Sequence, residues 1–313
     1  AILAQGQLAC LVRYRTCIMH SALLIVAASA STALSLSPAR WVSDDQVSLI
    51  QTHVSMVGRA RRWPQPGDPS LEITFVDRMM VAAFKAAATA GAAEAINRTV
   101  LPMCCVPVRL DIEEGVYDVI FEVLRNYQDD KYQYVQQNAW RGLSDQSHTE
   151  LGARVIANVG GPNKGIEYMV QQMQAHPEPY YALCSDHLTL KYEIMACISG
   201  LVKNDQENVW GPAAVEAGLL EQLVYTMRAE PDLIATQATA CRVMDPLLQR
   251  NPQYVAPLLS LGALELVETA MERFKGGDDT PFHFGTTVGQ MYDITSSCQM
   301  PHLVLLAGRN ATA

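Results

Sequence analysis

The chain is poor in the patterns from which β-sheets are built. No stretch between turn signals alternates convincingly between apolar and polar residues, and aromatic residues make up only 7% of the 313 positions. Alternation of that kind marks a half-buried strand, so we expect no sheet. Ala, Leu, Met, Gln and Glu are plentiful, which favours helices, and an apolar share of 49% is enough to form a full buried core.

An excess of basic residues is also missing. The formal net charge is −9 at pH 7. Binding to a phosphate backbone needs clustered Lys and Arg side chains. We therefore expect no nucleic-acid partner.

Paired cysteine motifs are missing as well. No CxxC pair occurs, which excludes a zinc ribbon or a thioredoxin-type site. The eight cysteines are scattered, whereas disulfide-stapled secreted domains concentrate them. We expect buried free thiols, because cysteine is often simply a core residue. The eight are Cys10, Cys17, Cys104, Cys105, Cys184, Cys197, Cys241 and Cys298.

Residues 1–42 form a leader that differs from the rest of the chain. Arg13 and Arg15 precede an apolar run from residue 22 to about 36. Ala28-Ser29-Ala30 resembles the small-residue pattern at which a signal peptide is cleaved. The run is too short and too rich in Ser and Thr to predict a transmembrane span. A signal or transit segment and a disordered leader remain equal alternatives, and a helix packed on the domain is a third. We expect no membrane partner unless the leader is retained, and a cytoplasmic location unless residues 13–36 act as a targeting segment for an organelle or the secretory pathway.

Residues 43–109 are predicted to be a helical N-terminal extension. One helix is expected to begin near Ser43, an N-cap residue followed by two aspartates. The proline-rich stretch 63–70 then breaks the chain. A second long helix is expected over 71–96.

From 110 to 308 the chain repeats one pattern. A glycine stands nine residues before a large apolar anchor residue, and another apolar residue lies four before the anchor, on the same helix face. The anchors recur after 49, 54 and 44 residues, periods typical of stacked helical repeats. The pairs are Gly115 and Leu124, Lys164 and Met173 (with the glycine displaced to Gly165), Gly218 and Met227, and Gly262 and Met271.

A second helix is expected in each unit after a polar break. The four predicted segments are 135–145, 191–205, 235–251 and, more weakly, 286–297. Each has a small residue near its middle, which lets consecutive helices approach closely. The small residues are Ala139, Ala196, Ala240 and Gly289.

These segments resemble the armadillo repeat family. "NAWRGLSD" (138–145) is similar to the family's Asn-Ala-Ala-Trp-Ala-Leu-Ser-Asn stretch, and "EAGLLEQLVYTM" (216–227) to its Gly-x-x-x-x-Leu-Val helix. The resemblance covers about four units over 110–308, and HEAT-type repeats are the nearest alternative. It implies an all-α, right-handed α-solenoid. The implied function is a protein–protein interaction scaffold or adaptor, or a subunit of a larger assembly, with a protein partner and no chemistry of its own.

Nuclear import receptors of this family bind basic peptides through a ladder of Trp and Asn on the third helix of each repeat. None of the three units that can be aligned keeps the pair, and Trp140 is one residue out of register. A peptide-binding transport receptor is therefore disfavoured. The ladder positions hold Arg141 and Asp145, Ser199 and Lys203, and Arg242 and Pro246.

The cations at these positions are the candidate partner-binding face. Arg141, Lys203 and Arg242 would form a row on a concave surface and would favour an acidic or mixed partner segment. The alternative is that each cation pairs with a nearby carboxylate, as Arg141 could with Asp145 at helical spacing.

No catalytic, cofactor-binding or metal-binding residue is predicted. In "CSDH" (184–187), Asp186 is expected to be the N-cap of a helix that starts at His187, because no oxyanion hole or orienting group can be located. The histidines show no spacing that would hold a metal. An enzyme with an unrecognised site remains the competing hypothesis, and it would show a deep pocket with converging titratable groups.

Overall fold

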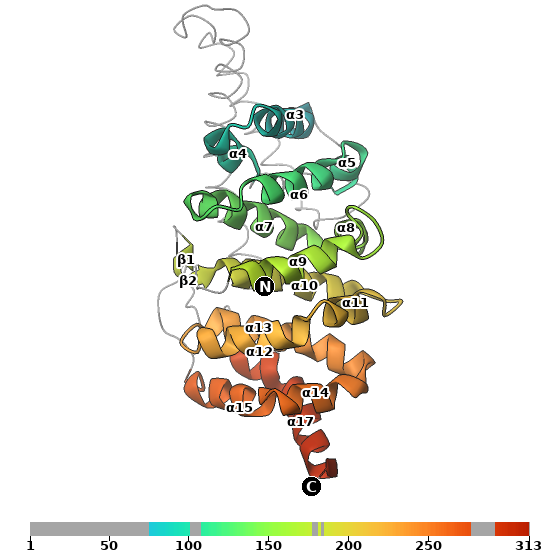
Figure 1. Cartoon of the computed structure of the whole chain (residues 1–313), viewed down its shortest axis with the longest axis vertical. Helices are drawn as coiled ribbons and strands as arrows, with labels where there is room; N and C mark the ends of the chain where they lie inside the picture. The colour runs from blue at the N-terminus through green and yellow to red at the C-terminus, as the bar shows by residue number, and fades with distance from the viewer. Residues whose placement is uncertain (1–74, 101–107, 177–180, 183–184, 277–291, 313) are drawn as a thin grey trace, which may run out of the picture.

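The computed structural model describes residues 75–100, 108–176, 181–182, 185–276 and 292–312 (Figure 1). This part of the chain is all-α apart from one short hairpin. The expected leader at 1–42 and the helix expected from Ser43 lie outside the described residues.

Helices in groups of three make up most of the described chain. Each of four successive groups has a short, a middle and a longer helix (Figure 1). The short helices are α5 (Val108–Glu113), α8 (Glu150–Ala157), α11 (Trp210–Glu216) and α14 (Val255–Ser260). The middle helices are α6 (Val116–Asn126), α9 (Lys164–Ala175), α12 (Leu219–Ala229) and α15 (Ala263–Arg273). The long helices are α7 (Gln133–Ser147), α10 (Leu190–Asn204), α13 (Ile234–Arg250) and α17 (Ile294–Thr312). The 3₁₀ turns η3 (Asp130–Tyr132) and η4 (Pro252–Tyr254) precede α7 and α14.

The groups pack in series. Helix α7 packs on α10, α10 on α13, and α13 on α17, so that the long helices lie side by side (Figure 1). Helices α3 (Phe75–Thr89) and α4 (Ala93–Val100) precede the first group, with α3 against α6 and α4 against α7. One hydrophobic core runs through all of these layers, from Val81 in α3 to Leu305 in α17.

The single helix predicted over 71–96 is wrong. Helix α3 ends at Thr89 and α4 begins at Ala93, with Gly91 between them at a φ of 65°. Glycine enters this left-handed region at the lowest cost of any residue, so Gly91 ends the helix inside an alanine-rich stretch that would otherwise continue it.

The predicted glycine turns occur in three groups. Gly115, Gly218 and Gly262 each stand directly before a middle helix, with φ values of 64°, 99° and 81°. In the second group the left-handed residue is Asn163, with a φ of 62°, and Lys164 is already the first residue of α9. Helix α9 therefore has one more residue between its turn and its apolar anchor than the other middle helices have.

The apolar anchors are buried where a further group covers them. The side chains of Leu124, Met173 and Met227 are at most 1% exposed. Met271 is only partly buried, because α15 belongs to the last described group.

A two-stranded hairpin contradicts the prediction of no sheet. Strands β1 (Tyr181–Ala182) and β2 (Ser185–Thr189) pair antiparallel between α9 and α10. The prediction that Asp186 caps a helix starting at His187 is also wrong, because both residues belong to β2. Thr189 is the N-cap of α10 instead, and its hydroxyl accepts a hydrogen bond from the Tyr192 amide at 3.1 Å.

The fourth long helix was predicted too early, over 286–297. Helix α17 begins at Ile294, and residues 286–291 lie outside the described residues. The helix continues past Pro301 to Thr312, with Cys298 and Leu305 fully buried. Burial of these side chains against the preceding group outweighs the loss of one backbone hydrogen bond at the proline.

The expectation of free thiols is wrong for two cysteines. Cys241 in α13 and Cys298 in α17 form a disulfide across 57 residues of sequence. The pairing follows from the contact between these two helices, which the spacing of cysteines along the chain does not show. Cys197 is the buried free thiol that was expected. The other five cysteines lie outside the described residues.

Within the described residues no single helix is both long and apolar enough to cross a membrane, and the one apolar pair that passes by length and composition, Pro252–Ser260 with Ala263–Arg273, is bent by 82°.

Candidate functional site

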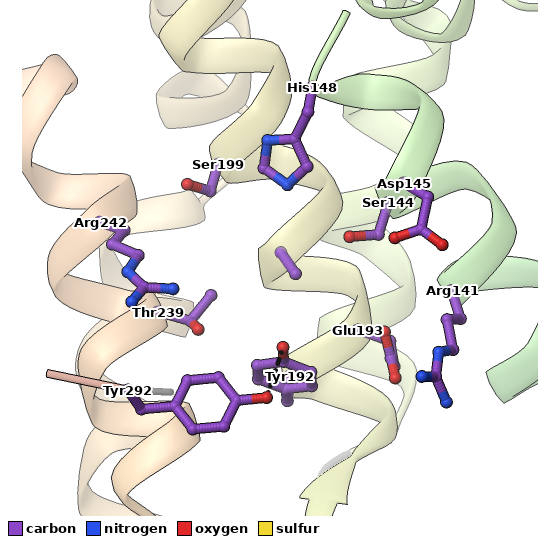
Figure 2. A pocket seen from close by; sticks show the side chains of 11 residues that line it. Arg141, Ser144, Asp145, His148, Tyr192, Glu193, Ser199, Thr239, Arg242 and Tyr292 are labelled. Atoms are coloured by element: carbon purple, nitrogen blue, oxygen red, sulfur yellow. Dashed lines mark hydrogen bonds between the residues drawn. The ribbon is translucent and has the colours of Figure 1, made fainter. Parts of the chain in front are cut away.

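A cavity of about 200 Å³ lies on the layer of long helices, among α7, α10 and α13 (Figure 2). Each helix contributes side chains from one face, and a tyrosine that precedes α17 completes the lining. The lining residues are Arg141, Ser144, Asp145 and His148 from α7, Tyr192, Glu193, Ala196 and Ser199 from α10, Thr239 and Arg242 from α13, and Tyr292.

Helical periodicity explains why these residues meet. On α7 the lining residues are spaced by three, four and seven positions, which places them on one side of the helix. The opposite side of α7 enters the core, where Ala139, Trp140 and Leu143 are fully buried. The polar side of the helix is therefore turned toward the cavity.

Two tyrosines form one wall of the cavity. The hydroxyls of Tyr192 and Tyr292 are 3.0 Å apart and share a hydrogen bond (Figure 2). Their rings meet edge to face, with centroids 5.8 Å apart. Burial raises the pKa of both hydroxyls, so both tyrosines stay neutral.

Arg242 is held in place from two sides. Its Nε donates a hydrogen bond to the Ser297 hydroxyl at 3.1 Å, and its guanidinium carbon lies 5.9 Å from the centroid of the Tyr292 ring. Ser297 belongs to the first turn of α17, and Tyr292 lies just before that helix. The disulfide between the neighbouring residues Cys241 and Cys298 ties the same two helices together.

Glu193 is a buried acid beside Arg141 (Figure 2). Glu193 is only 7% exposed, and this burial raises the pKa of its carboxyl group to about 8. The positive charge of Arg141 opposes this rise, and the negative charge of Asp145 adds to it. Glu193 is therefore mostly protonated at neutral pH and can donate a hydrogen bond.

His148 lies at the other end of the cavity from the tyrosine pair (Figure 2). Partial removal from water lowers its pKa, and the positive charges of Lys203 and Arg242 lower it further. His148 is therefore neutral at pH 7. With Glu193 also neutral, the charges that line the cavity at pH 7 are those of Arg141, Arg242 and Asp145.

Comparison with known proteins gives no match: no family model, curated protein or solved structure is similar enough to this chain. Among the described residues, no group of three or more His, Cys, Asp or Glu is arranged to hold a metal ion. The side chains that line the cavity are therefore the evidence for a function.

The structure brings together two of the three cations predicted as a partner-binding face. Arg141 and Arg242 both line the cavity. Lys203 is exposed on the same helix as Ser199, one turn beyond the lining, and its charge acts on His148. Its backbone carbonyl accepts a hydrogen bond from Arg250 at 3.0 Å.

Sequence reasoning missed four lining residues that matter for the chemistry. His148 lies two turns after Arg141, and Tyr192 two turns before Ser199, so extending the aligned face by seven residues would have found both. Glu193 stands three positions before Ala196, and this helical spacing places both on one side of α10. Tyr292 precedes α17 and belongs to no aligned position, so no sequence signal pointed to it.

Proposed function

We propose that the protein is an armadillo-type α-solenoid that serves as a protein-binding scaffold or adaptor, or as a subunit of a larger assembly. The groups of short, middle and long helices that pack in series support this proposal. Armadillo units contain three helices, whereas HEAT units contain two, so the triplets favour the armadillo type. Repeat proteins of this shape expose much surface per residue for partners.

One observation carries the binding proposal: a polar, net positive cavity lies on the layer of long helices of an otherwise acidic chain. Three consecutive long helices line it together, so a segment bound there would cross several repeats. Arg141, Arg242 and the nearby Lys203 favour a segment of acidic or mixed charge, because charge complementarity sets partner choice and association rate.

The same cations argue against a transport receptor for basic signal peptides. Arg141 and Arg242 stand at positions where such receptors have Trp, and Lys203 at a position where they have Asn. A cation there repels a lysine side chain, while a Trp ring would attract it.

The binding proposal is tested by affinity purification followed by mass spectrometry at two salt concentrations. We expect the triple variant Arg141→Ser, Lys203→Ser, Arg242→Ser to lose partners that the wild-type chain recovers, and to lose the salt sensitivity of their recovery. A charge-matched control replaces three exposed cations on α5, α8 and α9, namely Arg109, Arg154 and Lys164, by Ser. Loss of the same partners in the control, or their unchanged recovery by the folded triple variant, contradicts the proposal.

A second candidate function, an enzyme, is favoured by one specific observation. Ser144, Ser199, His148 and Asp145 line the same cavity, and Glu193 there has a raised pKa. Hydrolases use a serine activated by a histidine. In the described structure, however, His148 makes no hydrogen bond to either serine. Labelling of the full chain by a fluorophosphonate probe, abolished by Ser199→Ala or Ser144→Ala, would establish the enzyme and displace the scaffold proposal.

For the location we propose the organelle or secretory alternative over the cytoplasm. The Cys241–Cys298 disulfide supports it, because structural disulfides persist in oxidising compartments. Fusing residues 1–42 to a fluorescent reporter tests the proposal: a reporter that stays evenly cytoplasmic contradicts it.

A further inference from the structure

Two cations lie on opposite walls of the cavity. Arg141 belongs to α7 and Arg242 to α13, with α10 between them (Figure 2). The hydrogen bond from Arg242 to Ser297 orders its side chain before any ligand arrives. Pre-ordered arginines bind anionic oxygens well, because little side-chain entropy is lost on binding.

The remaining polar lining consists mostly of hydrogen-bond donors. Ser144, Ser199 and Thr239 are at most 8% exposed and provide hydroxyls. Tyr192 and Tyr292 donate one hydroxyl proton within their own pair, so the pair provides one further donor. Hydroxyl and guanidinium donors together match an acceptor-only group such as a carboxylate.

The net charge of the cavity lining matches a ligand group that carries one negative charge. Two arginines face one ionised carboxylate, Asp145, because Glu193 is held protonated and His148 is neutral. The lining therefore has a net charge of about one positive unit. A carboxylate neutralises that charge, whereas a doubly charged phosphate would leave an excess of negative charge.

The size of the cavity matches a single side chain. Its volume of about 200 Å³ is below the range of roughly 300–1,000 Å³ that holds small-molecule ligands. Three successive long helices, α7, α10 and α13, contribute to its lining, so an occupant contacts more than one group of helices.

We infer that this cavity takes one carboxylate side chain, aspartate or glutamate, from an extended segment of a partner protein, bound between Arg141 and Arg242. The inference rests on the proposed scaffold function and names the residue type that the scaffold recognises.

Protonation of Glu193 makes this binding dependent on pH. As the pH rises through about 8, Glu193 ionises, its negative charge cancels that of one arginine, and it stops donating a hydrogen bond. Binding of a carboxylate therefore weakens from pH 6.5 to pH 9. The titratable and charged groups that share the cavity with Glu193 are Arg141, Asp145 and His148 from α7, Tyr192 from its own helix, Arg242 from α13, and Tyr292. The buried thiol of Cys197, one turn further along α10, also interacts with Glu193.

In the test, a displayed random library of 12-residue peptides is selected for binding to the full chain. We expect the wild-type chain to enrich peptides that share one Asp or Glu at a fixed position. A chain with Arg141→Gln and Arg242→Gln should lose that enrichment, and a control with Arg109→Gln and Arg154→Gln should keep it. Circular dichroism shows whether each variant is folded.

Synthetic versions of a selected peptide then measure the contact. Replacing its acidic residue by the matching amide should weaken binding about tenfold or more, as expected for a charge-assisted pair. The Glu193→Gln chain should bind the peptide equally at pH 6.5 and 9, unlike the wild-type chain.

The outcomes separate the inference from the function on which it rests. Peptides that need Arg141 and Arg242 but share no acidic residue overturn the inference and leave the scaffold intact. Tighter binding of a phosphoserine than of a glutamate at the shared position also overturns the inference. Enrichment of no peptide by any folded chain overturns the scaffold proposal itself.

Discussion

At the level of single residues, the packing of the described helices depends on apolar anchor side chains. A single helix cannot bury these side chains by itself. Leu223 and Met227 are at most 1% exposed, on the face of α12 that enters the core. The spacing of four residues predicted their shared face, and the structure confirms their burial. Removing such a side chain leaves a cavity, because close-packed neighbours relax only in part.

We predict that Met227→Ala lowers the free energy of unfolding by on the order of 2–5 kcal/mol. Urea denaturation followed by circular dichroism measures the change. Met300→Ala is the matched control, because Met300 is 43% exposed, and it should change stability by less than about 0.5 kcal/mol. Equal effects for the two variants would mean that α12 does not pack as described.

We predict that Glu193 makes the stability fall as the pH rises. Its pKa of about 8 in the folded chain lies above its ordinary value of 4.5, so folding takes up a proton between these pH values. This contribution to stability is complete below pH 4.5 and is lost as the pH passes through about 8. Glu193→Gln should remove it, so the variant gains stability relative to wild type as the pH rises from 5 to 9. A difference between the two chains that does not change with pH contradicts the prediction.

Some polar contacts could not be read from the sequence. The Gln136 side chain donates to the Tyr127 carbonyl at 2.7 Å, and Gln237 donates to the Met227 and Glu230 carbonyls at 2.9 Å. Each glutamine ties the start of a long helix to the end of the middle helix before it. A buried glutamine in a helix looks like any surface residue in a sequence, because its partners are backbone carbonyls that only the packing brings near.

At the scale of elements, local turn chemistry decided most of the boundaries. Glycine turns placed the starts of α6, α12 and α15 correctly, since a φ near +60° to +100° favours glycine over other residues. The hairpin β1–β2, the break before α4 and the late start of α17 were missed. Hairpin pairing and the placement of α17 depend on neighbours distant in sequence, which local patterns do not contain.

We predict that Gly115→Ala lowers the free energy of unfolding by roughly 1–2 kcal/mol, the cost of a left-handed residue with a Cβ. The added methyl group has space, since the nearest atom, an oxygen of Asp118, is 4.0 Å away, so the loss reports the backbone alone. Gly276→Ala is the control: its φ is not positive and nothing lies within 4 Å of the new Cβ. Thermal melts of both variants should show a loss for Gly115→Ala only.

We predict that the disulfide between α13 and α17 stabilises the chain by roughly 2–4 kcal/mol. Dithiothreitol should lower the melting temperature of the wild-type chain. The Cys241→Ser, Cys298→Ser variant should melt at a lower temperature with or without the reductant. A wild-type melt that dithiothreitol leaves unchanged would contradict the presence of the bond.

In the molecule as a whole, the packing of the helix groups in series brings residues that are distant in the sequence to one surface. Arg141 and Arg242 are about a hundred positions apart in the chain, yet they line one cavity because α7, α10 and α13 pack in order. The repeat period predicted this arrangement in outline. The period could not predict the neutral Glu193 or the Tyr192–Tyr292 pair, which depend on how deeply each side chain is buried.

Site-specific photo-crosslinking shows whether the partner contacts the layer of long helices. A photoreactive amino acid replaces Lys203, exposed on α10 beside the cavity, or Arg154, exposed on α8 away from it. Mass spectrometry identifies the proteins joined to each chain in extracts of the source cells. We predict a distinct partner adduct from position 203 and none of that partner from position 154. The same partner joined through position 154 alone would contradict the account.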